Sequence, residues 1–393
     1  MTVSSFLALA IAAFAAAFGY AAIMPLLPQL LASLLPQAGP LALSWHVGAF
    51  AAVYMVAVVV FSRAWGAASD RYGTKPIVVI GLAGSALAVF GLAFADGLLS
   101  AYIGRAVQGA FASAILPVAI SALARISDTA ERARKVAGLG AASLLGFFAA
   151  PALSAAVVSS AVADPVAAVF YASALVALAA LAIVFSASRL APQRPPESTG
   201  STRALPTRFL ALNLLAYFGL GAFEVALPLA ARGPLAADAA SVSAFFAVCS
   251  LMMLVAQGAL MWAAPFRHRF PQVLVAGIVA YAAGLLWLAG AGSFGAALWA
   301  VGLIAAGSGL VLPLVGFLAT LEIQSRPGAA LGALTAAGGL GQALGSISGG
   351  ALYGYVGMGM FTATAFAVAL GAWLASPSCA PRWLGGGSRC SRN

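Results

Sequence analysis

Two charged side chains lie inside long apolar stretches, and these are the residues whose chemistry stands out. Arg105 lies in an apolar run over 98–121, and Glu224 is the acidic residue well inside a run over 208–231. A charge at mid-bilayer costs roughly 2.5–3.5 kcal/mol on insertion scales, so it usually faces a cavity or a partner. Both are candidates for binding a proton or a polar substrate. The alternatives are an Arg105 that bonds backbone carbonyls and a Glu224 that reaches water near the membrane surface.

No arrangement of residues for enzyme catalysis accompanies them. The two histidines, His46 and His268, are far apart in the sequence, and no metal-ligand spacing, nucleophile motif or Walker pattern is present. The sequence therefore predicts a protein that is not an enzyme and has no cofactor. An ion gradient, most simply of protons, is the expected energy source.

Composition indicates the elements that must position these residues. Of 393 residues, 63% are hydrophobic and 7% are charged, whereas a soluble domain carries about 25% charged residues. We therefore expect an all-α integral membrane protein, and at roughly 20 residues per span the length accommodates about twelve helices. The predicted spans cover residues 5–33, 44–64, 75–95, 98–121, 135–159, 164–187, 208–231, 240–263, 271–291, 295–320, 329–355 and 357–376.

The basic residues predict the orientation. Nearly all of the 19 Lys and Arg residues fall in alternate loops, which would face the cytoplasm if both termini are cytoplasmic; Arg105 and Arg232 are the exceptions. This pattern also explains the net charge of +10 without a nucleic-acid partner. The high Ala and Gly content suggests a multi-pass protein of a bacterial inner membrane.

A polar segment divides the chain. Residues 188–207 are rich in Pro, Ser, Thr and Arg, which predicts a flexible cytoplasmic linker between a six-helix half at 1–187 and a second at 208–376. Residues 377–393 would form a cytoplasmic tail. Short echoes between the halves suggest a repeat: Phe18-Gly19 recurs as Phe218-Gly219, and the glycine at 146 has a counterpart at 341.

A short charged stretch at 66–76 joins the second and third spans. Glycine there allows close approach of backbones and a turn at positive φ. The stretch resembles the loop between helices 2 and 3 of the major facilitator superfamily, roughly G-x-L-A-D-R-x-G-R-R, although Ala68, Ser69 and Thr74 depart from it. The matching residues are Gly66, Asp70, Arg71, Gly73 and Lys75.

The resemblance extends to the two charged residues inside spans. Arg105, Gln108 and Gly109 are similar to the fourth-helix motif of that family, whose arginine is associated with proton coupling. In the family, helices 1, 4, 7 and 10 line a central cavity, so Arg105 and Glu224 would face it from opposite halves. The resemblance implies that they pair there, and that a proton or a cationic substrate breaks the pair.

The fifth span carries a partial antiporter motif. Gly146 and Pro151 match the family pattern G-x-x-x-G-P-x-x-G-G, while Ala150, Ser154 and Ala155 replace its other glycines by small residues. Small side chains allow close helix contact and the proline allows a bend. The match favours an exporter over an importer.

Further residues are expected to support these sites. The resemblance implies that Asp70 lies at the N-terminus of the eleventh helix, near 328–330, and latches the two halves. Tyr20, among other aromatic residues, is a candidate for lining a pocket, and Gln342, among other amides, is a candidate hydrogen-bonding group in the cavity.

The predicted function is secondary active transport by alternating access, most simply proton-coupled efflux of amphipathic or cationic compounds. The expected partners are a small-molecule substrate, protons and the lipid bilayer, with the chain acting as a monomer. One alternative is a proton symporter or facilitator that imports a metabolite. An alternative of another class is a membrane sensor or assembly factor that transports nothing, for which Asp70, Arg105 and Glu224 would be dispensable.

Overall fold

The computed structural model describes residues 2–124, 126, 128–160, 162–187, 205–235, 239–262, 269–322 and 327–375. The described chain is helical and contains no strand. The helices are α1 (Val3–Ala21), η1 (Met24–Leu26), α2 (Leu27–Leu34), α3 (Pro40–Tyr72), α4 (Thr74–Leu92), α5 (Leu98–Ala112), α6 (Leu116–Ala124), α7 (Thr129–Ser159), α8 (Pro165–Ser186), α9 (Thr207–Arg232), α10 (Ala239–Trp262), α11 (Phe270–Ala289), α12 (Phe294–Glu322), α13 (Pro327–Val356) and α14 (Gly359–Ala375).

Most of these helices have the length that a bilayer requires. Ten helical stretches of the described chain are long and apolar enough to cross a membrane, counting Val3–Leu34 and Leu98–Leu123 as one stretch each. The apolar helix α14 is shorter, with 17 residues. The all-helical membrane fold is therefore confirmed, and the count of twelve spans and the side of the termini remain predictions.

Proline interrupts two of the predicted spans. In the first, α1 ends at Ala21, and Pro25 and Pro28 lie in the first turns of η1 and α2, where a fixed φ and a missing N–H are tolerated. The span predicted over 98–121 is present as an apolar helical stretch over Leu98–Leu123. It is interrupted, because α5 ends at Ala112 and α6 begins at Leu116. The cause is Pro117, which has no N–H to donate to the carbonyl of Ser113 and whose ring would clash with it.

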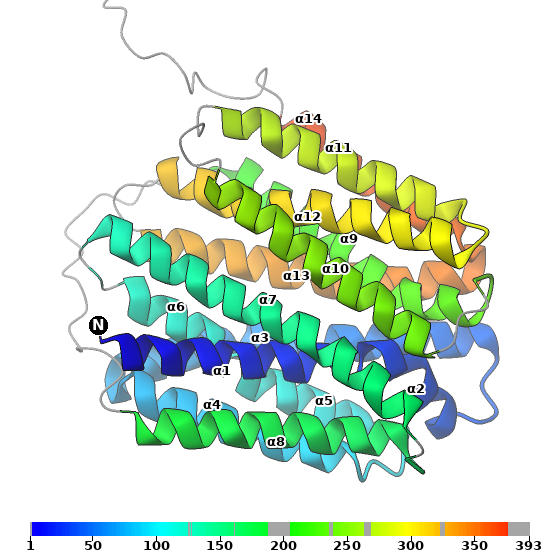
Figure 1. The fold of residues 1–393 in the computed structure, drawn as a ribbon, viewed down its shortest axis with the longest axis horizontal. Coiled ribbons are helices and arrows are strands. Elements are labelled where there is room, and N and C mark those ends of the chain that lie inside the picture. The colour runs from blue at the N-terminus through cyan, green and yellow to red at the C-terminus, as the bar shows by residue number, and fades with distance from the viewer. Residues whose placement is uncertain are drawn as a thin grey trace, which may run out of the picture.

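The helices of the first and second parts of the chain gather on different sides of the molecule. Figure 1 shows α1–α8 on one side and α9–α14 on the other. The two sides meet where α3 packs against α13 and α7 packs against α10. Most of the predicted linker and all of the predicted tail lie outside the described residues, so the division into two six-helix halves remains a prediction.

Glycines allow the same close helix crossing on both sides. A Cβ added at Gly146 of α7 would lie under 3.0 Å from the carbonyl oxygen of Phe14 on α1. A Cβ at Gly341 of α13 would meet the carbonyl oxygen of Leu214 on α9 in the same way. The sequence echo between residues 146 and 341 therefore has a structural counterpart.

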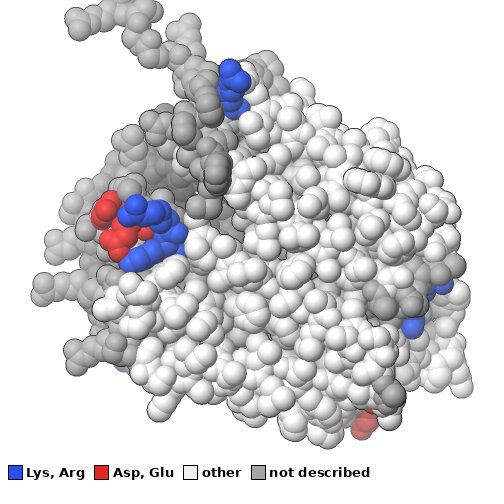
Figure 2. Space-filling view, viewed as in Figure 1, with Lys and Arg blue, Asp and Glu red and all other residues white. Residues whose placement is uncertain are grey.

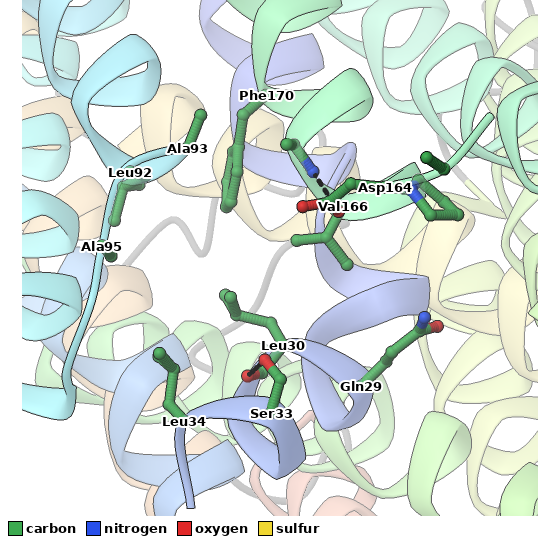
Figure 3. Close-up of a pocket in the computed structure, with 13 residues that line it drawn as sticks. Gln29, Leu30, Ser33, Leu34, Leu92, Ala93, Ala95, Asp164, Val166 and Phe170 are labelled. Atoms are coloured by element: carbon green, nitrogen blue, oxygen red, sulfur yellow. Dashed lines mark hydrogen bonds between the residues drawn. The ribbon is translucent and has the colours of Figure 1, made fainter.

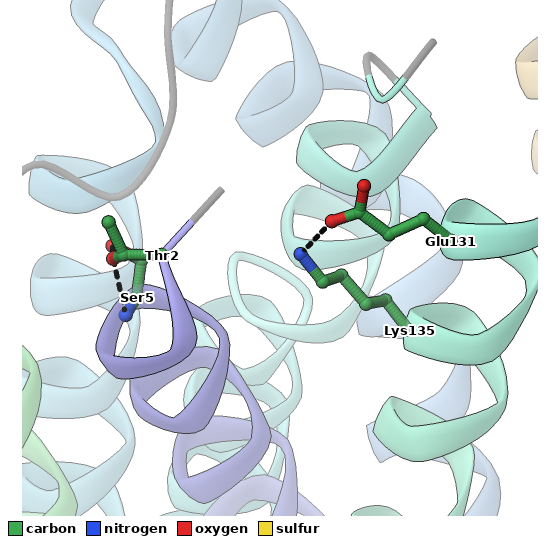
Figure 4. A network of polar contacts seen from close by, with 4 residues as sticks. All are labelled: Thr2, Ser5, Glu131 and Lys135. Carbon is green, nitrogen blue, oxygen red and sulfur yellow. Dashed lines mark hydrogen bonds and ion pairs between the residues drawn. The ribbon is translucent and has the colours of Figure 1, made fainter. Parts of the chain in front are cut away.

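On the face shown in Figure 2, charged side chains occupy small parts of the described surface. In the view of Figure 2, a cluster of acidic and basic atoms lies at the N-terminal end of α7, and almost all of the described surface around it is uncharged. Lys135 and Glu131 form an ion pair in this cluster (Figure 4). The uncharged surface suits helices that face lipid.

Candidate functional site

Three polar side chains from three helices meet in the interior. The hydroxyl of Tyr20 on α1 donates to Oε2 of Glu224 on α9, over 2.9 Å. Nε2 of Gln342 on α13 lies 3.0 Å from the same oxygen and 3.1 Å from the Tyr20 hydroxyl oxygen, and donates to both. One carboxylate oxygen thus receives donors from both sides of the molecule.

A second polar group lies beside the first. Nη1 of Arg105 on α5 donates to Oε1 of Gln108 over 2.7 Å, and Nε2 of Gln108 donates to the carbonyl of Gly19 over 3.0 Å. The guanidinium carbon of Arg105 lies 4.6 Å from the ring centre of Tyr54, 5.2 Å from that of Tyr20 and 5.6 Å from that of Phe50. Aromatic faces at these distances attract a cation.

Tyr20 belongs to both groups. Its hydroxyl binds Glu224, and its ring faces Arg105. The direct pairing of Arg105 with Glu224 that the family resemblance implied is absent: no nitrogen of Arg105 lies within ion-pair distance of the Glu224 carboxylate among the described contacts. We call Tyr20, Arg105, Gln108, Glu224 and Gln342 the polar cluster.

The polar cluster is almost completely closed to solvent. Arg105 is 0% exposed and Glu224 is 7% exposed. Nε and Nη2 of Arg105 have no hydrogen-bond partner in the structure. An unmade hydrogen bond of a buried group costs about 1–3 kcal/mol, and more when the group is charged. The three aromatic faces offset part of that cost, and the cluster is left able to take a new partner.

The cluster involves helices that the sequence did not indicate. The family resemblance implied residues from the first, fourth, seventh and tenth spans. The structure places α1, α5 and α9 there, but α12 gives none of the five side chains, and α13 gives Gln342 instead. Phe50 and Tyr54 of α3 were not predicted at all. Their spacing of four residues on one apolar helix face was the available signal.

The charged stretch at 66–76 is mostly helix. α3 continues to Tyr72 and α4 begins at Thr74, so the connection between the two helices is a single residue. Gly73 is that residue, with φ of 93°, as the expected turn at positive φ requires. Gly66 lies inside α3, and a Cβ there would meet nothing within 4 Å.

The charged side chains of this stretch have different surroundings. Nζ of Lys75 donates to the carbonyl of Ala187 at the end of α8 over 2.6 Å. Arg71 lies over the ring of its neighbour Tyr72. The side chains at 328–330, where Asp70 is expected to dock, lie outside the described set, so that contact remains a prediction.

The fifth-span motif lies against α1. Gly146 packs on the backbone of Phe14, and Pro151 lies inside α7. The hydroxyl of Ser154, where the family pattern has glycine, donates to the carbonyl of Ala22 over 2.6 Å. Because Ala22 is the C-cap of α1, this serine satisfies a carbonyl that the break in the helix leaves free.

A cavity lies away from the polar cluster. It has a volume of about 250 Å³ and lies between α2, the connection after α4, and the start of α8 (Figure 3). Asp164 lines it, but its carboxylate already accepts the backbone N–H of Ala167 and caps α8. Most of the other lining residues have apolar side chains, and Leu30 and Phe170 lie on opposite walls.

A bundle of membrane-length helices around a buried, charged cluster is the architecture of a membrane transporter. The Major Facilitator Superfamily description matches residues 9–346, most of the chain. The chain belongs to this superfamily of transporters, which are not enzymes.

Curated relatives match part of the sequence. The class G tetracycline resistance protein of Vibrio anguillarum is 38% identical over 137 residues, which is 35% of this chain and 34% of that protein. The class B protein of Escherichia coli is 33% identical over 135 residues, 34% of this chain and 33% of that protein. The chain thus matches about a third of the length of these relatives. A triacylglyceride transporter of Mycolicibacterium smegmatis is 36% identical over 93 residues, 24% of this chain and 17% of that protein.

Solved structures match the whole fold. The human organic anion transporter MFSD10 aligns with a TM-score of 0.77 at 18% identity, over 96% of this chain and 100% of that one. A D-xylose-proton symporter aligns with a TM-score of 0.78 at 14% identity, over 95% and 96% of the two chains. At these identities the likeness concerns the fold.

Proposed function

We propose that the chain exports amphipathic or cationic small molecules in exchange for protons, by alternating access. The observation that carries the proposal is the buried carboxylate of Glu224, held between α1, α9 and α13 by Tyr20 and Gln342. A buried carboxylate must be balanced by donors or by positive charge. A proton or a cationic substrate meets that requirement equally well, so the two compete for Glu224.

Arg105 adds the second half of the exchange. Its guanidinium carbon lies 5.2 Å from the ring centre of Tyr20, so its positive charge favours an ionised Glu224 without a direct contact. When the helices move and the separation of Arg105 from Glu224 changes, the affinity of Glu224 for a proton changes with it. That dependence on conformation is what proton coupling requires.

The direction of transport rests on two partial similarities. Relatives named for tetracycline resistance are 33–38% identical over about a third of the chain. Gly146 and Pro151 keep part of the antiporter motif, and Gly146 allows a close approach of α7 to α1. Both favour export.

We also propose the arrangement in the membrane. Twelve spans in two six-helix halves, with both termini cytoplasmic in a bacterial inner membrane, agree with the distribution of Lys and Arg. The chain would act as a monomer, because the polar cluster is complete within one copy.

The 66–75 motif would then lie on the cytoplasmic side and latch the two halves. Asp70 is the residue to test, because its carboxylate suits a helix N-terminus. We expect Asp70→Asn to lower transport several-fold and to shift the balance between conformations. Unchanged transport and an unchanged balance would contradict this role.

The test uses everted membrane vesicles that contain the protein. Respiration acidifies the vesicle interior, a quenched dye follows the pH gradient, and compounds are added in turn, beginning with tetracycline and tetraphenylphosphonium. A transported compound should dissipate the gradient. Glu224→Gln should abolish this response, and Glu131→Gln, the same change in the cluster at the start of α7, should retain it.

Each outcome bears on the proposal. A response that survives in Glu224→Gln would keep antiport and remove Glu224 from it. The absence of any response, together with proton-driven uptake of a compound by whole cells, would favour the alternative of a symporter. The fold of the D-xylose-proton symporter is compatible with that alternative.

A further inference from the structure

Tyr20 is the residue that contacts both charges of the polar cluster. Its hydroxyl lies 2.9 Å from the carboxylate of Glu224, and its ring centre lies 5.2 Å from the guanidinium carbon of Arg105. Tyr20 is 2% exposed, so water does not compete for either contact. Its position on α1 connects the first side of the molecule to α9 and α13 of the second side.

We propose that Tyr20 is a positioning residue that makes separation of the two sides depend on the charge of Glu224; the inference rests on the proposed function. With Glu224 ionised, Tyr20 donates to a negative oxygen, and such bonds are roughly twice as strong as bonds between neutral groups. When a proton adds to the carboxylate, the bond becomes one between neutral groups. Protonation therefore weakens the link between α1 and α9, and the two sides separate more readily.

Gln342 strengthens the ionised arrangement but cannot replace Tyr20. Its amide donates to Glu224 and to the Tyr20 oxygen, and it lies on α13, on the same side as Glu224. Loss of the Tyr20 hydroxyl would leave Glu224 with a donor from its own side. The described hydrogen bond between Glu224 and α1 would then be gone.

Other titratable groups surround this contact. Glu224 is the carboxylate of the cluster, and the tyrosine, cysteine and arginine side chains around it ordinarily titrate at about pH 8.5 or above. The two histidines of the chain, His46 and His268, ordinarily titrate in this range and are not part of the cluster. A change in the separation of the two sides between pH 5.5 and 8 is therefore assigned to Glu224 only if it disappears in Glu224→Gln. The titratable groups near enough to interact electrostatically with Glu224 or Tyr20 are Tyr54 on α3, Arg105 on α5, Tyr217 on α9, Cys249 on α10 and Tyr281 on α11.

Tyr54 provides a matched control for Tyr20. Both rings lie over Arg105, with Tyr54 the nearer, at 4.6 Å. The hydrogen bond to Glu224 comes from Tyr20. Replacing either residue by Phe removes one hydroxyl and keeps the ring, so the pair separates the hydrogen bond from the packing.

The experiment measures the separation of the two sides against pH. Spin labels are placed at Phe94 and Trp287, which are exposed near the ends of α4 and α11, after Cys249, Cys379 and Cys390 are replaced by Ser. Pulsed electron resonance gives the distance distribution of the purified full chain from pH 5.5 to 8. In this background protein without native cysteines, we expect the share of molecules with a longer distance between the two labels to increase as the pH falls.

Tyr20→Phe should show the low-pH distribution at every pH, with the long-distance population at pH 8 raised about tenfold or more, as loss of a charge-assisted bond predicts. Tyr54→Phe should follow the background. The inference would be overturned if the distance distribution of Tyr20→Phe changed with pH at the same midpoint and to the same extent as in the background protein.

A Glu224→Gln protein distinguishes a failure of the inference about Tyr20 from a failure of the proposed role of Glu224. It should also show the low-pH distribution at every pH. Persistence of the pH response in Glu224→Gln, or its absence in the background, would sink the role of Glu224 and the inference together. Loss of the response in Glu224→Gln alone, with Tyr20→Phe unaffected, would sink the inference and leave the role of Glu224 intact.

Discussion

Two of the contacts between the sides of the molecule are built from opposite kinds of residue. In the polar cluster, α1 meets α9 and α13 through buried charged and polar side chains. Where α3 meets α13, glycines bring the backbones together: a Cβ at Gly48 would lie under 3.0 Å from the carbonyl oxygen of Ser346, and a Cβ at Gly350 would lie equally close to that of Ser44. We call this second contact the glycine seam.

The two contacts differ in whether their strength depends on pH. The glycine seam depends on shape and dispersion, so its strength does not change with pH. The polar cluster contains a carboxylate and a guanidinium, so its strength changes when a proton or a cation binds. The glycine seam defines how the two sides pack together, and the polar cluster makes that packing depend on the binding of a proton or a cation. Substitutions in each should therefore have different signatures.

The largest expected effect comes from Arg105 in the polar cluster. Arg105→Ala removes the bond to Gln108 and the cation between three aromatic rings, and should lower proton-coupled transport about 100-fold or more, since a charge-assisted bond and desolvated cation–π contacts are lost together. Arg105→Lys keeps the charge but loses the planar fork, and should lose about tenfold. Transport in vesicles is the measurement. Arg232→Ala, at an exposed position, is the control, and equal activity of Arg105→Ala and the wild type would contradict the assignment.

A substitution in the glycine seam should have a smaller effect of another kind. Gly48→Ala or Gly350→Ala forces the backbones apart, and core overpacking typically costs 1–3 kcal/mol. We expect about tenfold less transport, with the pH at which transport is half-maximal unchanged. Gly295→Ala adds a methyl group where nothing lies within 4 Å and should be neutral. A shift of the pH profile in Gly48→Ala would show that the two contacts are not separate.

Lys75 lies outside both contacts and should affect stability. Lys75→Met removes the bond to the carbonyl of Ala187, worth about 1 kcal/mol or slightly more for a charged donor. The thermal midpoint in detergent should fall by a few degrees, and Lys75→Arg should restore part of it. No change in midpoint would mean that the carbonyl finds another donor.

The smallest expected effect is at the ion pair of Glu131 and Lys135. The hydrogen bond and charge of Lys135 lower the pKa of Glu131, so the pair stabilises the fold above the ordinary glutamate pKa and loses this contribution as the pH falls through the lowered value. Lys135→Met should lower the thermal midpoint slightly at pH 7. The difference from the wild type should vanish in acid and in high salt, and a difference that persists there would indicate a packing role.

Much of the fold was predictable because it follows from local patterns. Apolar runs between charged loops gave helices close to the predicted boundaries, and α14, expected at 357–376, spans Gly359–Ala375. The break between α5 and α6 was missed because the apolar run continues through it, although Pro117 was the signal. The helix α3 is longer than the span predicted at 44–64, because it continues through the charged stretch to Tyr72.

The candidate site was predictable only in part. Charge inside an apolar run singles out Arg105 and Glu224, because such residues are costly in lipid whatever the fold. The sequence could not predict that Arg105 and Glu224 are connected through Tyr20 and not by a direct ion pair. It depends on a tyrosine that, in the sequence, is one of several aromatic residues in apolar runs.

The sequence by itself determined that this is a helical membrane protein with a charged residue, Arg105 or Glu224, inside each of two spans, because hydropathy and the cost of buried charge act locally. The tertiary structure alone decided which groups surround those charges. Gln342 and Tyr20 are 322 positions apart and meet because helix rotation and crossing bring them together. The rotation and crossing of the helices are set by close contacts such as the one between Gly341 and Leu214, which form only when the whole bundle packs.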